Sequence, residues 1–237
     1  GDWKAIKLNE NFEHDLEGMR AAIDSNTKLV YITNPNNPTA TITNPKRLLD
    51  FCSEVSDKVP VFVDEAYLEL AEGGLTNSMA QLVSEGKDII ITRTFSKIHG
   101  MAGLRMGYMI AKPERIEKIN NITRGGMGIS GPTIMAAMSS LDDVDFLESC
   151  KNKIVSNREY TVENLKARGF KPMPSNANFL IFELPKKLDP NKYLTEIYSK
   201  SVTVKVFKFW NKNWCRVSIG TKNSMNIFFN ALDEIIV

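Results

Sequence analysis

The stretch VPVFVDEAY, Val59–Tyr67, changes from a continuous apolar run to two carboxylates within a few positions. Its apolar part, Val59–Val63, is rich in β-branched valine and predicts a short strand that is buried on both faces. Such strands are typical of parallel sheets that helices cover on both sides. In open sheets of this class, ligands bind outside the carboxyl ends of the strands. The stretch therefore predicts a fold class and points to Asp64 and Glu65 as residues near a site.

The segments on either side of this strand repeat the same alternation. Asn44 and Pro45 are a helix cap and a first helical residue, and apolar spacing predicts a helix over 46–57. The other expected elements are strands at Lys28–Thr33, Asp88–Thr92 and Arg105–Ala111, and a short helix at 78–85. We expect an α/β fold with a mostly parallel sheet sandwiched by helices.

The pattern changes after Pro113. Helices are expected over 114–121 and 133–141, followed by a long amphipathic helix over 144–168 that ends at Gly169. Beyond it we expect strands at Asn178–Glu183, Val202–Phe207 and Cys215–Ile219, with helices over 191–200 and from Ser224. This smaller α+β unit predicts two domains, 1–145 and 146–237, and we interpret GGMGISGP, 125–132, as a hinge between them.

Composition excludes several function classes. The chain has 237 residues, 43% of them hydrophobic and 24% charged, and a net charge of +2 without a basic stripe. We therefore expect no nucleic-acid partner, and no apolar run reaches the length of roughly 18 residues that suggests a membrane span. The three cysteines lie far apart without metal-type spacing, which favours reduced thiols, no metal site and a cytoplasmic location. The first residues, GDWKAIKLNE, show an extended alternation and resemble the middle of a fold, so we expect a longer protein.

Polar clusters follow three of the predicted strands: Asn34–Thr39, Asp64–Tyr67 and Thr94–Lys97. Because parallel strands end at one edge of a sheet, we expect these clusters to meet in one pocket, with Arg105 nearby. A carboxylate can hold a protonated heteroaromatic nitrogen, an amide and a phenol can bind a ring oxygen, and hydroxyls with a guanidinium suit a phosphate. A lysine amine can condense with an aldehyde. Pyridoxal 5'-phosphate combines these handles.

The motifs NPNNPT, DEAY, TFSKIHGMAGLR and CRVSIGT, in this order and spacing, resemble the fold-type I, class I/II pyridoxal-phosphate-dependent aminotransferases. The chain is most similar to the histidinol-phosphate aminotransferase branch. The resemblance covers nearly the whole chain but only the later two thirds of the family. The family's first third, with a glycine-containing phosphate loop and an aromatic residue that stacks on the cofactor, is absent. Ala40 also replaces the glycine that usually closes the first motif.

The resemblance implies a role for each matching residue. Lys97 matches the catalytic lysine that binds the cofactor aldehyde, and Asp64 matches the partner of the pyridine nitrogen. Arg216 matches the arginine that holds the substrate carboxylate, and Asn178 matches an asparagine close to the substrate. The remaining matches are cofactor ligands: Asn37 and Tyr67 for the ring oxygen, and Thr94, Ser96 and Arg105 for the phosphate.

The implied function is transfer of an amino group between an amino acid, or an amino-alcohol phosphate such as histidinol phosphate, and a 2-oxo acid. The resemblance also implies a homodimer. Two alternatives remain: a decarboxylase or lyase acting on a phosphorylated amino acid, and a non-catalytic aminotransferase-like fragment. Taken singly, Lys97 is also compatible with a solvated loop. We expect His99 and His14 to be packing residues, and Glu65 to cap a turn or face solvent.

Overall fold

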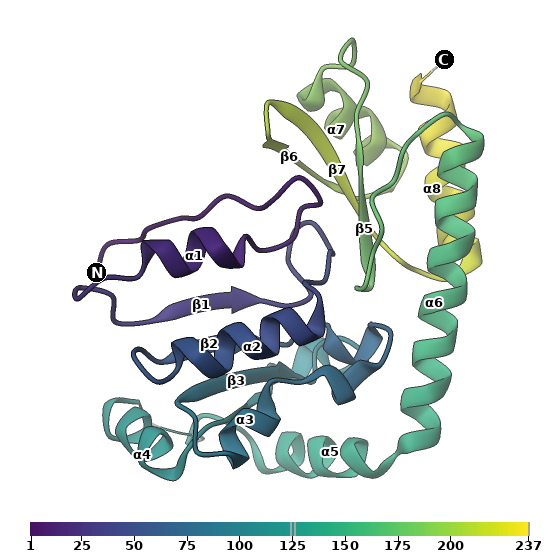
Figure 1. The fold of residues 1–237 in the computed structure, drawn as a ribbon. Helices are drawn as coiled ribbons and strands as arrows, with labels where there is room; N and C mark the ends of the chain where they lie inside the picture. Colours follow the sequence, from purple (N-terminus) through teal and green to yellow (C-terminus); the bar gives the residue numbers. More distant parts are fainter. Residues whose placement is uncertain (124, 126, 237) are drawn as a thin grey trace.

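The computed structural model describes every residue except Arg124, Gly126 and Val237. Its first sheet contains β1 (Val30–Thr33), β2 (Val61–Asp64), β3 (Ile89–Thr94) and β4 (Gly107–Ile110), side by side in that order. The first three strands are parallel and β4 is antiparallel to β3 (Figure 1). The register pairs Thr33 with Asp64 and Asp64 with Thr92, so the polar ends of the strands lie at one edge. The predicted α/β fold with a mostly parallel sheet is confirmed.

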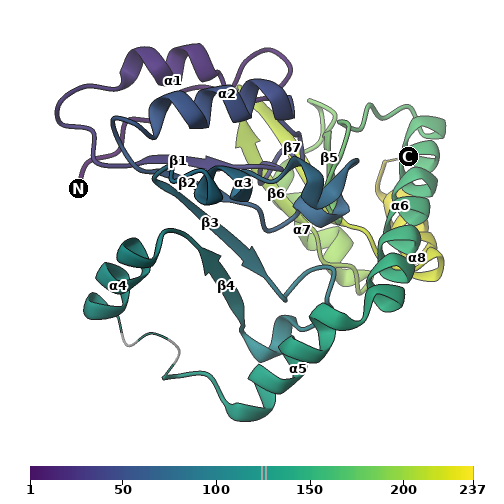
Figure 2. The same ribbon diagram turned by 60° about the horizontal axis from the view of Figure 1, so that its bottom comes forward.

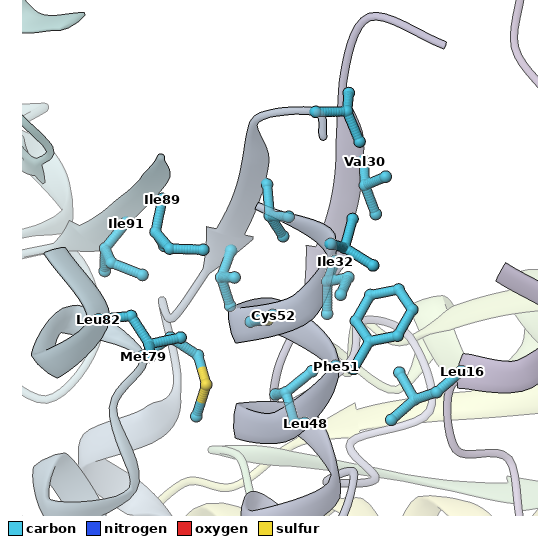
Figure 3. Packing of buried hydrophobic residues seen from close by; sticks show 14 residues of the cluster. Leu16, Val30, Ile32, Leu48, Phe51, Cys52, Met79, Leu82, Ile89 and Ile91 are labelled. Carbon is cyan, nitrogen blue, oxygen red and sulfur yellow. The ribbon is translucent and has the colours of Figure 1, made fainter. Parts of the chain in front are cut away.

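Three helices cover one face of this sheet: α1 (Leu16–Ala22), α2 (Pro45–Val55) and α3 (Ala80–Ser84). Their apolar side chains pack on the strands, and Figure 3 shows Phe51 of α2 between this layer and the sheet. Helix α2 begins as expected, because the Asn44 side chain accepts a hydrogen bond from the Arg47 backbone N–H. The opposite face carries Tyr31 and Phe62, whose rings stack with centroids 5.2 Å apart.

The second half of the chain builds a separate antiparallel sheet of β5 (Phe179–Glu183), β7 (Lys212–Ser218) and β6 (Lys205–Phe209), in that order. It is reached through α4 (Pro113–Ile122), α5 (Gly131–Asp142) and α6 (Val144–Ala167). Helix α6 is long and continuous, and runs from α5 to a position beside α8 (Figures 1 and 2). The remaining helices are α7 (Pro190–Ser199) and α8 (Lys222–Ile236). The division at residue 145 stays a prediction.

Short 3-10 turns complete the first half: η1 (Leu68–Leu70), η2 (Gly74–Asn77) and η3 (Ala102–Leu104). The first and third of these lie directly after the DEAY motif and within the TFSKIHGMAGLR motif. Both loops are therefore compact, which fixes the backbone that follows the ends of β2 and β3.

The N-terminal segment differs from expectation. Within the described residues, 1–15 contain no strand, and the sequence interpretation missed helix α1. The signals for α1 were present, since Asp15 caps the helix by accepting from the Gly18 N–H and Glu17 lies in the first turn. Phe12 packs against Ile181 and Trp214 of the second sheet, so this segment connects the two halves of the molecule. Of the predicted hinge over 125–132, Gly126 lies outside the described residues.

Across the described part of the chain, no helix combines the length and the apolarity that crossing a lipid bilayer demands.

Candidate active site

An open pocket of about 310 Å³ lies at the carboxyl ends of β2 and β3. Its lining brings together most of the predicted cofactor ligands and the predicted catalytic lysine: Asp64, Thr94, Ser96, Lys97 and Arg105, with Ala66, Thr92 and Arg93. The cause is the parallel register, which places residues about 30 positions apart in sequence at adjacent strand ends. The pocket therefore contains an amine, a carboxylate, a guanidinium and several hydroxyls within one small volume.

One end of the pocket is suited to an anion. The Ser96 backbone N–H donates to Thr94 Oγ1 at 3.1 Å, so the two hydroxyl-bearing residues form a tight turn. Arg105 adopts the left-handed region with φ of 53°, and its Nη1 donates to the Ala102 carbonyl at 2.9 Å. That backbone carbonyl bond orients the guanidinium and leaves its other N–H groups for a ligand. Hydroxyls beside an exposed guanidinium can bind a phosphate.

The carboxylate of Asp64 lines the same pocket, at the end of the neighbouring strand β2. Its Oδ1 accepts the Ala66 backbone N–H at 3.0 Å, which fixes the rotamer of the side chain. Burial, together with the Asp64 carboxylate, raises the pKa of the Tyr31 phenol. The backbone directly after β2 thus orients Asp64. A half-buried carboxylate held in this way can accept a hydrogen bond from a protonated ring nitrogen.

The other predicted residues form a continuous series of contacts that starts at Lys97. The Lys97 amine lies 5.2 Å from the centre of the Tyr67 ring, and that ring meets Phe179 edge-on with centroids 5.3 Å apart. The Arg216 guanidinium carbon stacks 3.8 Å from the centre of the Phe179 ring, and Arg216 Nη1 donates to Asn37 Oδ1 at 3.0 Å. The second sheet therefore supplies an arginine to the contacts that begin at Lys97, although Arg216, Tyr67 and Asn37 are not among the residues that line the pocket.

Asn178 is held through its backbone, because its carbonyl accepts the Ile219 N–H at 2.8 Å. It directly precedes Phe179, the residue on whose ring Arg216 stacks. Its neighbour Asn176 donates its backbone N–H to the Ala40 carbonyl at 2.8 Å. Ala40 is fully buried at φ of 61°, the left-handed conformation that favours glycine. The turn that closes NPNNPT thus has an alanine in the left-handed conformation.

The expectation for Glu65 is wrong. Its side chain is 1% exposed and accepts hydrogen bonds from the Ser78 hydroxyl, the Met79 N–H and Arg93 Nε. Glu65 lies next to Asp64 but on the helix-covered face, because successive side chains of a strand alternate. The turn-rich sequence that follows it suggested a solvent-facing carboxylate, and only the position of Arg93 across the strand pair reveals the ion pair.

His99 is a packing residue, as expected. It is almost fully buried against the Phe95 ring, its Nδ1 bonds to Ser140 Oγ at 2.8 Å, and its Nε2 lies 3.3 Å from Glu69 Oε1. His14 is also structural: its Nε2 donates to the Thr33 carbonyl at 2.8 Å. Neither ring lines the pocket. Sequence interpretation missed Phe179, whose only signal was an aromatic residue directly after Asn178.

A family model described as aminotransferase class I and II matches residues 1–232. This chain belongs to that aminotransferase family. The histidinol-phosphate aminotransferase of Moorella thermoacetica is 35% identical over 236 residues, which cover 98% of this chain and 60% of the relative. The aromatic amino acid aminotransferase of Mycolicibacterium smegmatis is 33% identical and covers 95% of this chain and 61% of its own length.

A solved aminotransferase structure has the same fold. It is the histidinol-phosphate aminotransferase of Sinorhizobium meliloti in complex with pyridoxal 5'-phosphate, with a TM-score of 0.86 and 26% identity. The match covers 98% of this chain and 64% of that one. The chain therefore spans about 60% of the length of the curated aminotransferases that it matches.

Proposed function

We propose that this chain binds pyridoxal 5'-phosphate in the pocket at the ends of β2 and β3 and transfers amino groups. The donor set fits the cofactor: Lys97 for the aldehyde, Asp64 for the ring nitrogen, and Thr94, Ser96 and Arg105 for the phosphate. Asn37 and Tyr67 would bind the ring oxygen. The pocket volume of about 310 Å³ is at the lower end of the range for small-molecule sites.

Each residue of this set would have its own role in amino transfer. When bound, the cofactor supplies an aldehyde that captures an amine and a conjugated ring that accepts electrons. Asp64 holds a proton on the ring nitrogen, and Arg216 holds the carboxylate of the donor through paired hydrogen bonds. Lys97 moves a proton to and from the α-carbon of the donor, as a general acid and base. The Phe179 ring supports the Arg216 guanidinium.

The amino donor that we propose is an amino acid or an amino-alcohol phosphate of the histidinol-phosphate type, with a 2-oxo acid as the acceptor. Two observations support this choice. Relatives of the chain are named histidinol-phosphate aminotransferase, and the cationic Arg216 can bind the anionic group of such a donor. Another relative is named aromatic amino acid aminotransferase, so aromatic amino acids are the second class of donor to test. Measuring turnover with histidinol phosphate, phenylalanine and tyrosine, each with 2-oxoglutarate, ranks the two classes.

The observation that carries the proposal is that Lys97 lines the same pocket as Asp64, Thr94, Ser96 and Arg105. The test is the visible absorption of the purified chain mixed with pyridoxal 5'-phosphate, recorded before and after adding an amino donor. We expect a band that changes with the donor, and Lys97→Ala should abolish both the change and turnover. Lys58→Ala, an exposed lysine beyond α2, is the matched control. Near-normal transamination by Lys97→Ala would contradict the assignment.

One alternative concerns the length of the chain. Because the chain spans about 60% of the length of its relatives, part of the cofactor site can come from residues beyond those matched. The chain would then be a non-catalytic fragment that binds cofactor without turnover. A band without any change on adding donor distinguishes this outcome from the enzyme. Release of carbon dioxide from the donor would instead indicate a decarboxylase or lyase.

We also infer a homodimer in a reducing, cytoplasmic compartment. Helix α5 exposes Met135, Met138 and Leu141, an apolar face that suits a second copy of the chain. The three cysteines are free, and Cys52 and Cys215 are buried. Light scattering of the wild type and of Met138→Glu tests the assembly, because a charge in the interface should give a monomer. Cell fractionation tests the location.

A further inference from the structure

Two neighbouring strand ends carry polar residues on both faces of the first sheet. Asp64 and Thr92 are paired in register and line the pocket. The apolar residues Val63 and Ile91 face the helices, so alternation sends the next odd-numbered side chains, Glu65 and Arg93, to the helix-covered face. Arg93 also borders the pocket at its base. Asp64 and Thr92 therefore face the pocket, whereas the residues that follow them, Glu65 and Arg93, face the helices.

Glu65 and Arg93 form a buried ion pair. Arg93 Nε donates to Glu65 Oε2 at 3.0 Å, and the two side chains are 10% and 1% exposed. The Glu65 carboxylate also accepts the Met79 N–H at 2.8 Å and the Ser78 hydroxyl at 2.8 Å to Oε2. Arg93 Nη2 donates to Ser78 Oγ at 2.7 Å. Together these bonds tie the ends of β2 and β3 to the start of α3.

The same guanidinium reaches the fourth strand. Arg93 Nη1 lies 3.4 Å from the Tyr108 hydroxyl, and its central carbon lies 6.0 Å from the centre of the Tyr108 ring. Tyr108 and Arg93 are directly paired in the antiparallel register of β3 and β4. The network therefore spans three strands and one helix immediately behind the pocket, at the level where Asp64 and Thr94 face it.

Net stability does not explain why a charge pair should occupy this place. Replacing a buried ion pair by apolar residues of similar size is often neutral or stabilising, whereas removing one partner is strongly destabilising. The ion pair instead restricts geometry. The hydrogen bonds between a carboxylate and a guanidinium are directional, so they limit how the two side chains can lie relative to each other. An apolar pair in the same place would leave the strand ends held by the backbone ladder alone, which ends with the Glu65 N–H donating to the Thr92 carbonyl at 2.9 Å.

We propose that Glu65 and Arg93 are positioning residues for the cofactor site: their ion pair holds the end of β2 against β3 so that Asp64 and Thr94 keep their separation. This inference rests on the proposed function, since that separation matters only if one ligand bridges the two side chains. Misplacement by about 1 Å at a reacting centre can lower a rate by around 100-fold. A cofactor bound through both ends is sensitive to the same displacement.

The test is the double variant Glu65→Leu/Arg93→Met, which removes both charges and keeps the volume. Its melting temperature should fall only moderately, because neither charge is left unpaired, although the Met79 N–H and the Ser78 hydroxyl lose their acceptor. The dissociation constant of pyridoxal 5'-phosphate, from titration of its absorption on the full chain, should rise at least about tenfold. The wavelength and the pH midpoint of the bound band should also shift, because Asp64 no longer meets the ring nitrogen squarely. A purely structural ion pair would move neither spectroscopic quantity.

The matched control is Arg168→Met/Asp233→Leu, which removes an ion pair between the end of α6 and α8, far from the pocket residues in the fold. It should leave cofactor binding within about twofold of the wild type. Arg93→Lys keeps the charge but loses the fork. If the double variant does not fold, Arg93→Lys tests the positioning role instead. We expect this variant to bind pyridoxal 5'-phosphate more weakly than the wild type although the charge is unchanged.

The outcomes separate the two proposals. A folded double variant, or Arg93→Lys, that binds cofactor as tightly as the wild type with an unchanged band overturns the positioning role alone. A wild-type chain that gives no Lys97-dependent band overturns the proposed function and this inference with it. Weaker binding in the Glu65/Arg93 variants, with the control pair unaffected, supports both.

Discussion

The Arg216 guanidinium donates a hydrogen bond to the Asn37 amide oxygen at 3.0 Å, although 179 positions separate the two residues. Asn37 follows β1 of the first sheet, whereas Arg216 lies in β7 of the second, paired with Ile181. The bond thus joins the loop after β1 of the first sheet to the second sheet. It also connects the residue proposed for the cofactor ring oxygen with the residue proposed for the substrate carboxylate.

This connection leads to the first prediction. Arg216→Lys loses the fork and the stacking on Phe179, and should raise KM for a carboxylate donor by roughly 10- to 100-fold, since hydrogen bonds to charged groups contribute about 1.5–3 kcal/mol. Cofactor affinity should stay unchanged. Steady-state kinetics and absorbance titration measure the two quantities, and Arg47→Lys on the exposed face of α2 is the control. Equal losses in cofactor and donor binding would argue against a substrate role.

The second prediction concerns Ala40. Its left-handed conformation costs an alanine about 1–2 kcal/mol, while its fully buried methyl contributes about 0.8 kcal/mol. Ala40→Gly should therefore change the free energy of unfolding by less than about 1 kcal/mol. Ala71 is equally buried at φ of −79°, so Ala71→Gly gains no relief and should be less stable than Ala40→Gly by about 1–2 kcal/mol. Urea unfolding measures both, and equal losses would show that Ala40 is unstrained.

The third prediction is an acid-side loss of stability from His14. Burial lowers the pKa of His14 below its usual value of 6.5, against a smaller opposing effect of its bond to the Thr33 carbonyl. Below pH 6.5 the unfolded chain binds a proton that the folded chain does not, so this contribution is present above pH 6.5 and is lost as pH falls towards the lowered pKa. His14→Gln should flatten the dependence of unfolding free energy on pH between about 5 and 7. Parallel wild-type and variant curves would exclude the residue as the cause.

The fourth prediction is an alkaline-side loss from a core thiol. Burial, assisted by the Glu65 carboxylate, raises the pKa of Cys52 from 9.0 to about 12. Between these values the unfolded chain releases a proton that the folded chain keeps, so stability is full below pH 9 and falls by about 1.4 kcal/mol per pH unit above it. Cys52→Ala should remove that part of the slope in urea unfolding between pH 9 and 11. The site of Cys52, against the sheet in Figure 3, makes its exposure depend on global unfolding.

Much of the first half could be predicted because its signals are local. Continuous valine and isoleucine runs predict buried strands, Asn44 and Pro45 predict the start of α2, and the polar residues after β2 and β3 predict a pocket. The burial of Glu65 could not be predicted from local signals. Whether a carboxylate after a strand faces solvent or a buried arginine depends on the residue that the next strand places opposite it, and Arg93 lies 28 positions away.

The order of residue types along the chain is enough to place a lysine, a carboxylate, hydroxyls and an arginine after predicted strands, in the order of the aminotransferase family. These follow from residue type and spacing along the chain. The contacts between distant side chains, such as Arg216 with Asn37 and Arg93 with Glu65, become visible in the folded molecule alone. Those contacts depend on strand register and on how two sheets pack, and both are properties of distant segments brought together by burial of their apolar faces.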